Sequence, residues 1–167
     1  MNRLRAVLGI TNKTEDNKFI PFLDFDSDNF ELMHMDIVNI REKFKLSNPF
    51  LIKSTNGFNV FFLDKMTFDD CLELCKNCHS IDLNFIKYAI KKNNFTLRIG
   101  KDKNFIHSLN SEYSEHELSF AHYQFFNEFF KVDILNGFEI TNLNFDELDE
   151  IELVMYMSKK YGYIQVD

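Results

Sequence analysis

An apolar run in this chain ends in two aspartates that are one residue apart: Phe19, Ile20, Pro21, Phe22, Leu23, Asp24, Phe25, Asp26. Such a run predicts a strand, and successive side chains of a strand point to opposite faces. Asp24 and Asp26 therefore project together, while Leu23 and Phe25 enter the core. Two adjacent carboxylates repel each other unless a cation lies between them or one is protonated. The pair predicts a Mg²⁺ or Mn²⁺ site at a strand end; the alternative is a strand that leads into a helix with an acidic cap.

The composition favours a folded domain. The chain has 167 residues, of which 45% are hydrophobic, including 20 Phe and no Trp, and this is enough to bury a sizeable core. No apolar run approaches the roughly 20 residues of a membrane span, and no signal-peptide pattern is visible. We expect a soluble, intracellular, cytoplasmic protein with no membrane partner.

The charge is unevenly distributed along the chain. The formal net charge of −7 argues against a protein that coats nucleic acid, because such proteins are normally basic. Residues 87–103 nevertheless carry six basic side chains and one acidic one, whereas residues 139–152 carry six acidic side chains and no basic one. The basic stretch predicts either a site for a phosphate-bearing ligand or a solvated helix and loop.

Apolar spacing and capping residues predict a mixed order of strands and helices. Ser27 or Asp28 is expected to cap the first helix, and Asn56-Gly57 predicts a hairpin turn because both residues tolerate positive φ. Ser114 and Glu117 form a capping-box pattern. The expected strands are 3–10, the run up to Asp26, 50–54, 58–63, 95–100, 137–141 and 163–166. The expected helices are 30–44, 67–77, 82–94, 115–130 and 145–160.

Three segments stand in one order: the Asp24-x-Asp26 strand, the hairpin from Ser54 to Phe62, and the strand from Phe95 to Lys101. In their order and spacing they resemble the archaeo-eukaryotic primase superfamily, the catalytic cores of primases and primase-polymerases. The resemblance covers residues 17–104. It implies one α/β (α+β) domain over residues 1–167 with an RRM-like central sheet and flanking helices, similar to the primase catalytic core. Residues 105–167 would form its helical and strand C-terminal part.

The resemblance also implies roles for individual residues. Asp24 and Asp26 would be catalytic and would hold Mg²⁺ or Mn²⁺. The triphosphate of an NTP or dNTP would be bound by Ser54, Asn59, Arg98 and Lys101. The implied activity is nucleotidyl transfer in DNA replication or repair, on a single-stranded or primed template, with a replication partner protein such as a helicase.

The chain departs from the family pattern at two points. Asn59 stands where the family has a histidine; asparagine can donate a hydrogen bond to a phosphate but cannot carry charge. The third acid is Asp82, which a helix-capping role explains equally well, or Asp102. An alternative function is therefore a catalytically degenerate relative that binds nucleic acid or a partner protein.

The three cysteines, Cys71, Cys75 and Cys78, lie along one predicted helix. Free cysteine is among the most buried residue types, and this spacing gives the three thiols a common helical face. Burial in the core is the favoured interpretation, ahead of a structural Zn²⁺ site and an iron–sulfur cluster. Convergence of the thiols on an ion would instead indicate a small metal-binding interaction domain unrelated to primases.

Overall fold

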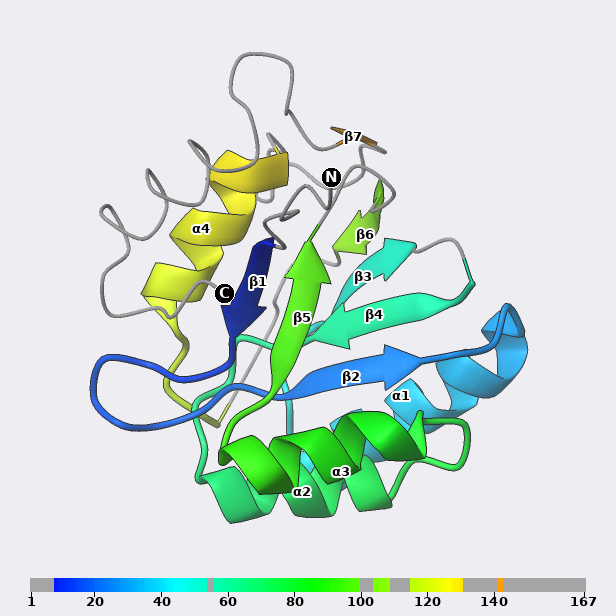
Figure 1. The fold of residues 1–167 in the computed structure, drawn as a ribbon, viewed down its shortest axis with the longest axis horizontal. Helices are drawn as coiled ribbons and strands as arrows, with labels where there is room; N and C mark the ends of the chain where they lie inside the picture. Colours follow the sequence, from blue (N-terminus) through cyan, green and yellow to red (C-terminus); the bar gives the residue numbers. More distant parts are fainter. Residues whose placement is uncertain (1–7, 54–55, 100–103, 109–114, 131–140, 143–167) are drawn as a thin grey trace, which may run out of the picture.

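The computed structural model describes residues 8–53, 56–99, 104–108, 115–130 and 141–142. These residues form a mixed α+β structure with antiparallel sheets, as the sequence predicts (Figure 1). The described strands are β1 (Leu8–Thr11), β2 (Phe22–Phe25), β3 (Phe50–Lys53), β4 (Phe58–Phe61), β5 (Thr96–Ile99), β6 (Asn104–Ser108) and β7 (Thr141–Asn142). The described helices are α1 (Phe30–Phe44), α2 (Phe68–Lys76), α3 (Leu83–Lys92) and α4 (Phe120–Phe130).

The strands form two sheets. The larger sheet has the order β2-β4-β3-β6-β7, and all its pairs are antiparallel. The smaller sheet pairs β1 with β5, also antiparallel. In Figure 1, α1, α2 and α3 gather on one side of the molecule and α4 lies on the other. The strand predicted at 95–100 is present as β5. It pairs with β1 and not with β2, the strand that contains Asp24.

The alternation of β2 separates two environments. Leu23 and Phe25 are buried, and Phe58, which is paired with Phe25, packs edge-to-face against Phe30 of α1. The other face begins with Phe22, whose ring meets Phe126 of α4. Asp24 follows Phe22 on this second face because residues i and i+2 of a strand share a face. The aspartate strand thus has the predicted alternation.

Several helix boundaries differ from the prediction. Thr67 and Asp82 cap α2 and α3 as expected, but α1 is capped by Asn29, whose side chain accepts from Leu32 N at 3.2 Å. The expected caps Ser27 and Asp28 were thus wrong. The helix predicted from residue 115 begins at Phe120, because residues 117–119 run in extended pairing with residues 63–65 and form bonds such as Ser119 N to Leu63 O at 2.7 Å.

Some predicted elements fall outside the described residues, and one observed strand was not predicted. Ser114 and the C-terminal elements at 145–160 and 163–166 lie outside the described ranges, and only the end of the strand at 137–141 lies within them, at β7. Strand β6 was not predicted. None of the described helices has both the length and the apolar content needed to cross a membrane.

The predicted hairpin is confirmed, but the reason for its glycine is different. Strands β3 and β4 pair with Lys53 opposite Phe58, yet neither Asn56 nor Gly57 has φ in the left-handed region. A Cβ atom on Gly57 would lie 1.9 Å from the carbonyl oxygen of Phe25. Gly57 is therefore needed because the hairpin approaches the backbone of β2 too closely for a side chain.

We expect Gly57→Ala to lower the free energy of unfolding by about 2 kcal/mol or more, because the added methyl group meets backbone atoms that cannot rotate away. Urea denaturation followed by circular dichroism measures this loss. Asn56→Ala, at the exposed neighbouring position, is the control and should change stability little. Equal stability of the two variants would contradict the close approach.

Asn12 joins the two sheets. It is completely buried, and its side chain donates to the carbonyl of Ile20 at 2.9 Å and accepts from the N–H of Phe95 at 2.9 Å. Its backbone bonds the same two residues, through Asn12 N to Phe95 O and Ile20 N to Asn12 O. One residue after β1 thereby fixes the segments that lead into β2 and β5.

Replacement of Asn12 by Ala should destabilise the protein by about 3 kcal/mol, because it leaves one buried donor and one buried acceptor without partners. Chemical denaturation at neutral pH measures the effect. Asn39→Ala, at an exposed position of α1, is the matched control and should cost nothing. A loss below about 1 kcal/mol for Asn12→Ala would show that the junction relaxes or admits water.

Candidate functional site

Asp24 and Asn59 lie directly opposite each other on the neighbouring strands β2 and β4. The amide of Asn59 donates to Oδ1 of Asp24 at 3.0 Å. Asn59 is buried, whereas Asp24 is partly exposed. Directly opposite residues of an antiparallel pair have neighbouring side chains on one face. The structure therefore brings together one predicted metal ligand and one predicted nucleotide-binding residue.

Asp82 lies on the other edge of β2. Ile81 forms an antiparallel bridge with Phe25, and the N–H of Asp82 donates to the carbonyl of Asp24 at 2.9 Å. This register places Asp82 opposite Asp24, so the backbone presents Asn59, Asp24 and Asp82 in one row across the strand. The carboxylate of Asp82 accepts from the N–H of Asn84 at 3.0 Å and caps α3. The side chain of Asp82 thus caps α3, and its backbone is hydrogen-bonded to that of Asp24.

Asp26 follows the end of β2 and is exposed. It lies two residues after Asp24, the spacing that places successive side chains on one face of extended backbone. Among the described residues, no three His, Cys, Asp or Glu side chains gather closely enough to form a complete metal site. Mg²⁺ needs few protein ligands, because it is commonly bound by one or two carboxylates together with substrate phosphates and water. Asp24 and Asp26 are two carboxylates one residue apart in the sequence.

Lys53 is a basic residue at this end of the sheet that sequence analysis did not single out. It ends β3, and its ammonium group lies 2.5 Å from a carboxylate oxygen of Asp28, 3.3 Å from the carbonyl of Gly57 and 4.7 Å from the ring centroid of Phe58. Lys53 thus neutralises Asp28, the acid that follows the predicted metal ligands. The only feature of the sequence that could have indicated a role for Lys53 was its position directly after three apolar strand residues.

The remaining predicted nucleotide-binding residues are separate or not described. Arg98 belongs to β5, where its backbone pairs with Gly9 of β1. Ser54, Lys101 and Asp102 lie outside the described residues. The structure therefore unites Asp24, Asn59 and Asp82 by hydrogen bonds and register, and it gives Arg98 a place in the second sheet.

The prediction that the cysteines are buried is confirmed. Cys71 and Cys75 lie in α2 and Cys78 follows it, and all three are buried free thiols. The Cys75 thiol donates to the carbonyl of Phe22 at 3.6 Å, and the Cys78 thiol donates to that of Leu74 at 3.7 Å. Burial raises the pKa of Cys71 and Cys75 well above the usual value and that of Cys78 to about 12. The three side chains thus pack as protonated core groups.

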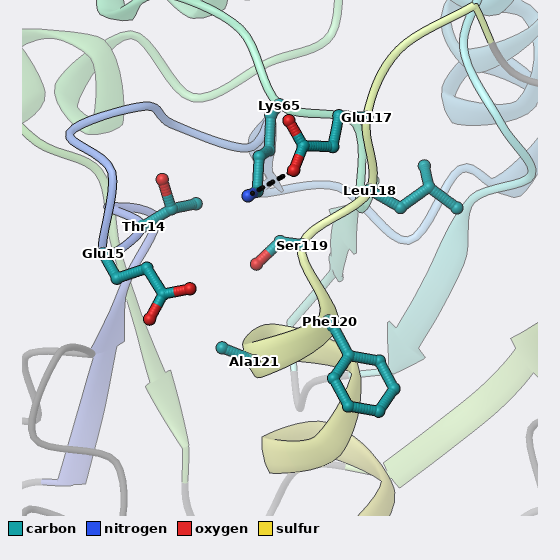
Figure 2. A pocket seen from close by; sticks show the side chains of 8 residues that line it. All are labelled: Thr14, Glu15, Lys65, Glu117, Leu118, Ser119, Phe120 and Ala121. Carbon is teal, nitrogen blue, oxygen red and sulfur yellow. Dashed lines mark hydrogen bonds and ion pairs between the residues drawn. The ribbon is translucent and has the colours of Figure 1, made fainter.

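A separate pocket of about 190 Å³ lies between the loop after β1 and the start of α4. Figure 2 shows Lys65 beside Glu117, with Thr14 and Glu15 facing Ser119 across the opening. The Lys65 ammonium is shared between Glu117 at 3.2 Å and Asp16 at 3.3 Å. The positive charge of Lys65 is thus already neutralised by these two carboxylates. We therefore assign no ligand to the pocket.

A buried hydrogen-bond chain runs behind this pocket. Nε2 of His122 lies 2.9 Å from the carbonyl of Thr11, and Nδ1 lies 2.6 Å from the hydroxyl of Ser119. A carbonyl can only accept, so Nε2 carries the proton and Nδ1 accepts from the Ser119 hydroxyl. Burial lowers the pKa of His122 to about 4, and the charge of Lys65 acts in the same direction. His122 is therefore neutral at physiological pH.

We expect the stability of the protein to fall as the pH decreases from about 6.5 to about 4. In this window the unfolded chain binds a proton at His122 that the folded state refuses, so stability rises with pH. A shift from 6.5 to about 4 corresponds to about 3 kcal/mol. Urea titrations at several pH values should show a loss of this size in the wild type relative to His122→Gln. Parallel pH profiles for the two proteins would contradict a neutral buried histidine.

Comparisons with known proteins identify no relative. No family model matches this chain, and no curated protein or solved structure is significantly similar to it. The function must therefore be argued from the residues and their geometry.

Proposed function

We propose that this chain is a primase-polymerase-like domain that binds a divalent cation and the phosphates of a nucleotide at the Asp24–Asp26 end of β2. The observation that carries this proposal is the pairing of Asp24 with Asn59 on adjacent strands. The resemblance assigns both residues to one nucleotide site, and the hydrogen bond between them agrees with that assignment. Asp24 and Asn59 are 35 positions apart in the chain, and the sequence separation alone does not require them to be in contact.

The strand order supports the same proposal. The segment β2-α1-β3-β4 forms a β-α-β-β unit in which β4 lies between β2 and β3. An RRM-like sheet is built from units of this kind. In it, the acidic strand and the hairpin strand are neighbours, so both motifs face the same ligand. One face of the unit carries Leu23 and Phe25; the other carries Asp24 beyond Phe22, which packs on Phe126 of α4.

In this proposal each residue has a chemical role. Asp24 and Asp26 hold Mg²⁺ or Mn²⁺, which when bound neutralises phosphate charge and stabilises the attacking and leaving oxygens of phosphoryl transfer. Asn59 donates an amide hydrogen bond to Asp24 and so orients that carboxylate; the resemblance also gives Asn59 a contact with the triphosphate. Asp82 is the candidate for a further carboxylate, in addition to its role as the cap of α3. Ser54, Arg98 and Lys101 would bind the triphosphate of an NTP or dNTP, opposite a nucleic-acid template delivered with a replication partner such as a helicase.

A second candidate function is nucleotide or nucleic-acid binding without catalysis. Two observations favour it. The Asp24 carboxylate is engaged by an asparagine that cannot transfer a proton at neutral pH, and the Asp82 carboxylate is engaged in capping α3. Two carboxylates with these partners could bind a cation–nucleotide complex and still lack the second metal on which two-metal transfer depends.

The first experiment measures Mn²⁺ binding by electron paramagnetic resonance, with and without a nucleoside triphosphate. We expect Asp24→Asn and Asp26→Asn each to weaken Mn²⁺ binding about tenfold or more, because a carboxylate ligand is lost. Asp28→Asn is the matched control, since this acid is exposed and paired with Lys53; it should bind like the wild type. Equal Mn²⁺ affinity in all four proteins would overturn the assigned site.

A template-dependent extension assay with Mg²⁺ or Mn²⁺ separates the two candidate functions. Product from the wild type that disappears in Asp24→Asn and Asp26→Asn indicates an enzyme. Mn²⁺-dependent nucleotide binding without product indicates the non-catalytic relative. Product that survives both substitutions would place the chemistry elsewhere.

A further inference from the structure

Helix α3 presents two contrasting faces. Phe85, Ile86 and Ala89 are buried against the core, and they lie on one side of the helix because residues three and four apart are neighbours. Figure 1 shows α3 on the outer side of the molecule, below β2 in that view. The opposite face of α3 is open to solvent and differs in character from an ordinary charged surface.

Large apolar side chains are exposed on this outer face. Leu83 is 68% exposed, Tyr88 63% and Ile90 52%. Leu83 and Ile90 are seven residues apart and form one shoulder of the face, whereas Tyr88 lies on the other shoulder. Exposed single apolar residues are normal, but three on one short helix indicate an interaction surface.

Lysines occupy the strip between the two shoulders. Lys87 and Lys91 are four residues apart and therefore lie one above the other along the centre of the face, with Lys92 beyond Tyr88. All three are exposed, and none forms an ion pair with any part of the chain that the structure describes. No acidic residue occurs between Leu83 and Lys92. Among the described residues, the positive charge of this face thus has no ion-pair partner, on a protein whose net charge is −7.

We propose that the outer face of α3, formed by Leu83, Lys87, Tyr88, Ile90 and Lys91, is a docking surface for an acidic amphipathic helix of a partner protein. Carboxylates spaced four residues apart on that helix pair with Lys87 and Lys91. Apolar residues on either side of them cover Leu83, Ile90 and Tyr88. Such a helix would match both the lysines and the apolar side chains of the α3 face. A nucleic acid or a membrane surface would not match both.

A nucleic-acid backbone would use the lysines but would leave Leu83 and Ile90 in contact with phosphates and water. A membrane surface would require the apolar side chains to gather on one face with the lysines at the opposite side. Here the lysines lie between the apolar residues. The ten-residue helix is about 15 Å long, so the interface is small and its affinity is in the micromolar range of transient complexes.

The test uses the full chain and a fluorescein-labelled helical peptide with Glu residues at i and i+4 flanked by Leu. Fluorescence anisotropy should show saturable micromolar binding. Lys87→Glu combined with Lys91→Glu should weaken binding about tenfold or more, because like charges then face each other. Tyr88→Ala should weaken it severalfold. Lys18→Glu combined with Lys45→Glu, which reverses two exposed lysines elsewhere, is the matched control and should bind like the wild type.

Reversing the charges on both partners tests the pairing of Lys87 and Lys91 with the carboxylates of the peptide, even where the affinity is low. The Lys87→Glu, Lys91→Glu protein should bind the same peptide with its Glu residues replaced by Lys, and the wild type should not. Four outcomes would overturn the proposal: no saturable binding, equal binding of a peptide with the same composition in scrambled order, or binding of either oligo(dT) or phosphatidylserine vesicles that is tighter than peptide binding and is lost in the Lys87→Glu, Lys91→Glu protein. Circular dichroism confirms that each variant remains folded.

Discussion

The hydrogen bonds of Asn12 are the constraint on which the rest of the structure depends. Four bonds from this one buried residue tie Ile20 and Phe95 to the end of β1. Since an unsatisfied buried amide is costly, the start of β2 and the start of β5 are fixed relative to each other. The Asp24 end of β2 is fixed by different contacts, which are the close approach of Gly57 and the bridge from Ile81. Contacts at both ends of β2 thus fix the strand that carries the candidate site.

The bridge from Ile81 depends in turn on a buried carboxylate. Asp36 of α1 accepts from the N–H groups of His79 at 3.0 Å and Ser80 at 2.9 Å. These bonds hold the turn after α2 against α1, and the next two residues are Ile81 and Asp82. Asp36 therefore acts on the site through the backbone: it positions the segment that brings Asp82 beside Asp24. The same segment begins α3, so the candidate cation site and the α3 surface share one anchor.

Local features of the fold could be predicted from the sequence, whereas the long-range pairing of strands could not. The caps Thr67 and Asp82 were predictable because each precedes an isolated apolar repeat. The cap of α1 was not, because Ser27, Asp28 and Asn29 are all good caps in succession. The start of α4 was misjudged because pairing with residues 63–65 extends the chain before the helix. No local signal indicates that Asp24 pairs with Asn59 or that Ile81 pairs with Phe25.

The carboxylates near the end of β2 differ in the contacts that stabilise their charge. Asp24 receives a hydrogen bond from Asn59, and Asp82 receives one from the first turn of α3. The N-terminus of a helix carries partial positive charge, so α3 offsets part of the negative charge that Asp82 adds beside Asp24. Asp26 has neither kind of support among the described contacts. It is the member of the group that gains most from a cation, and Asp26→Asn is therefore the substitution that separates a cation ligand from a structural acid.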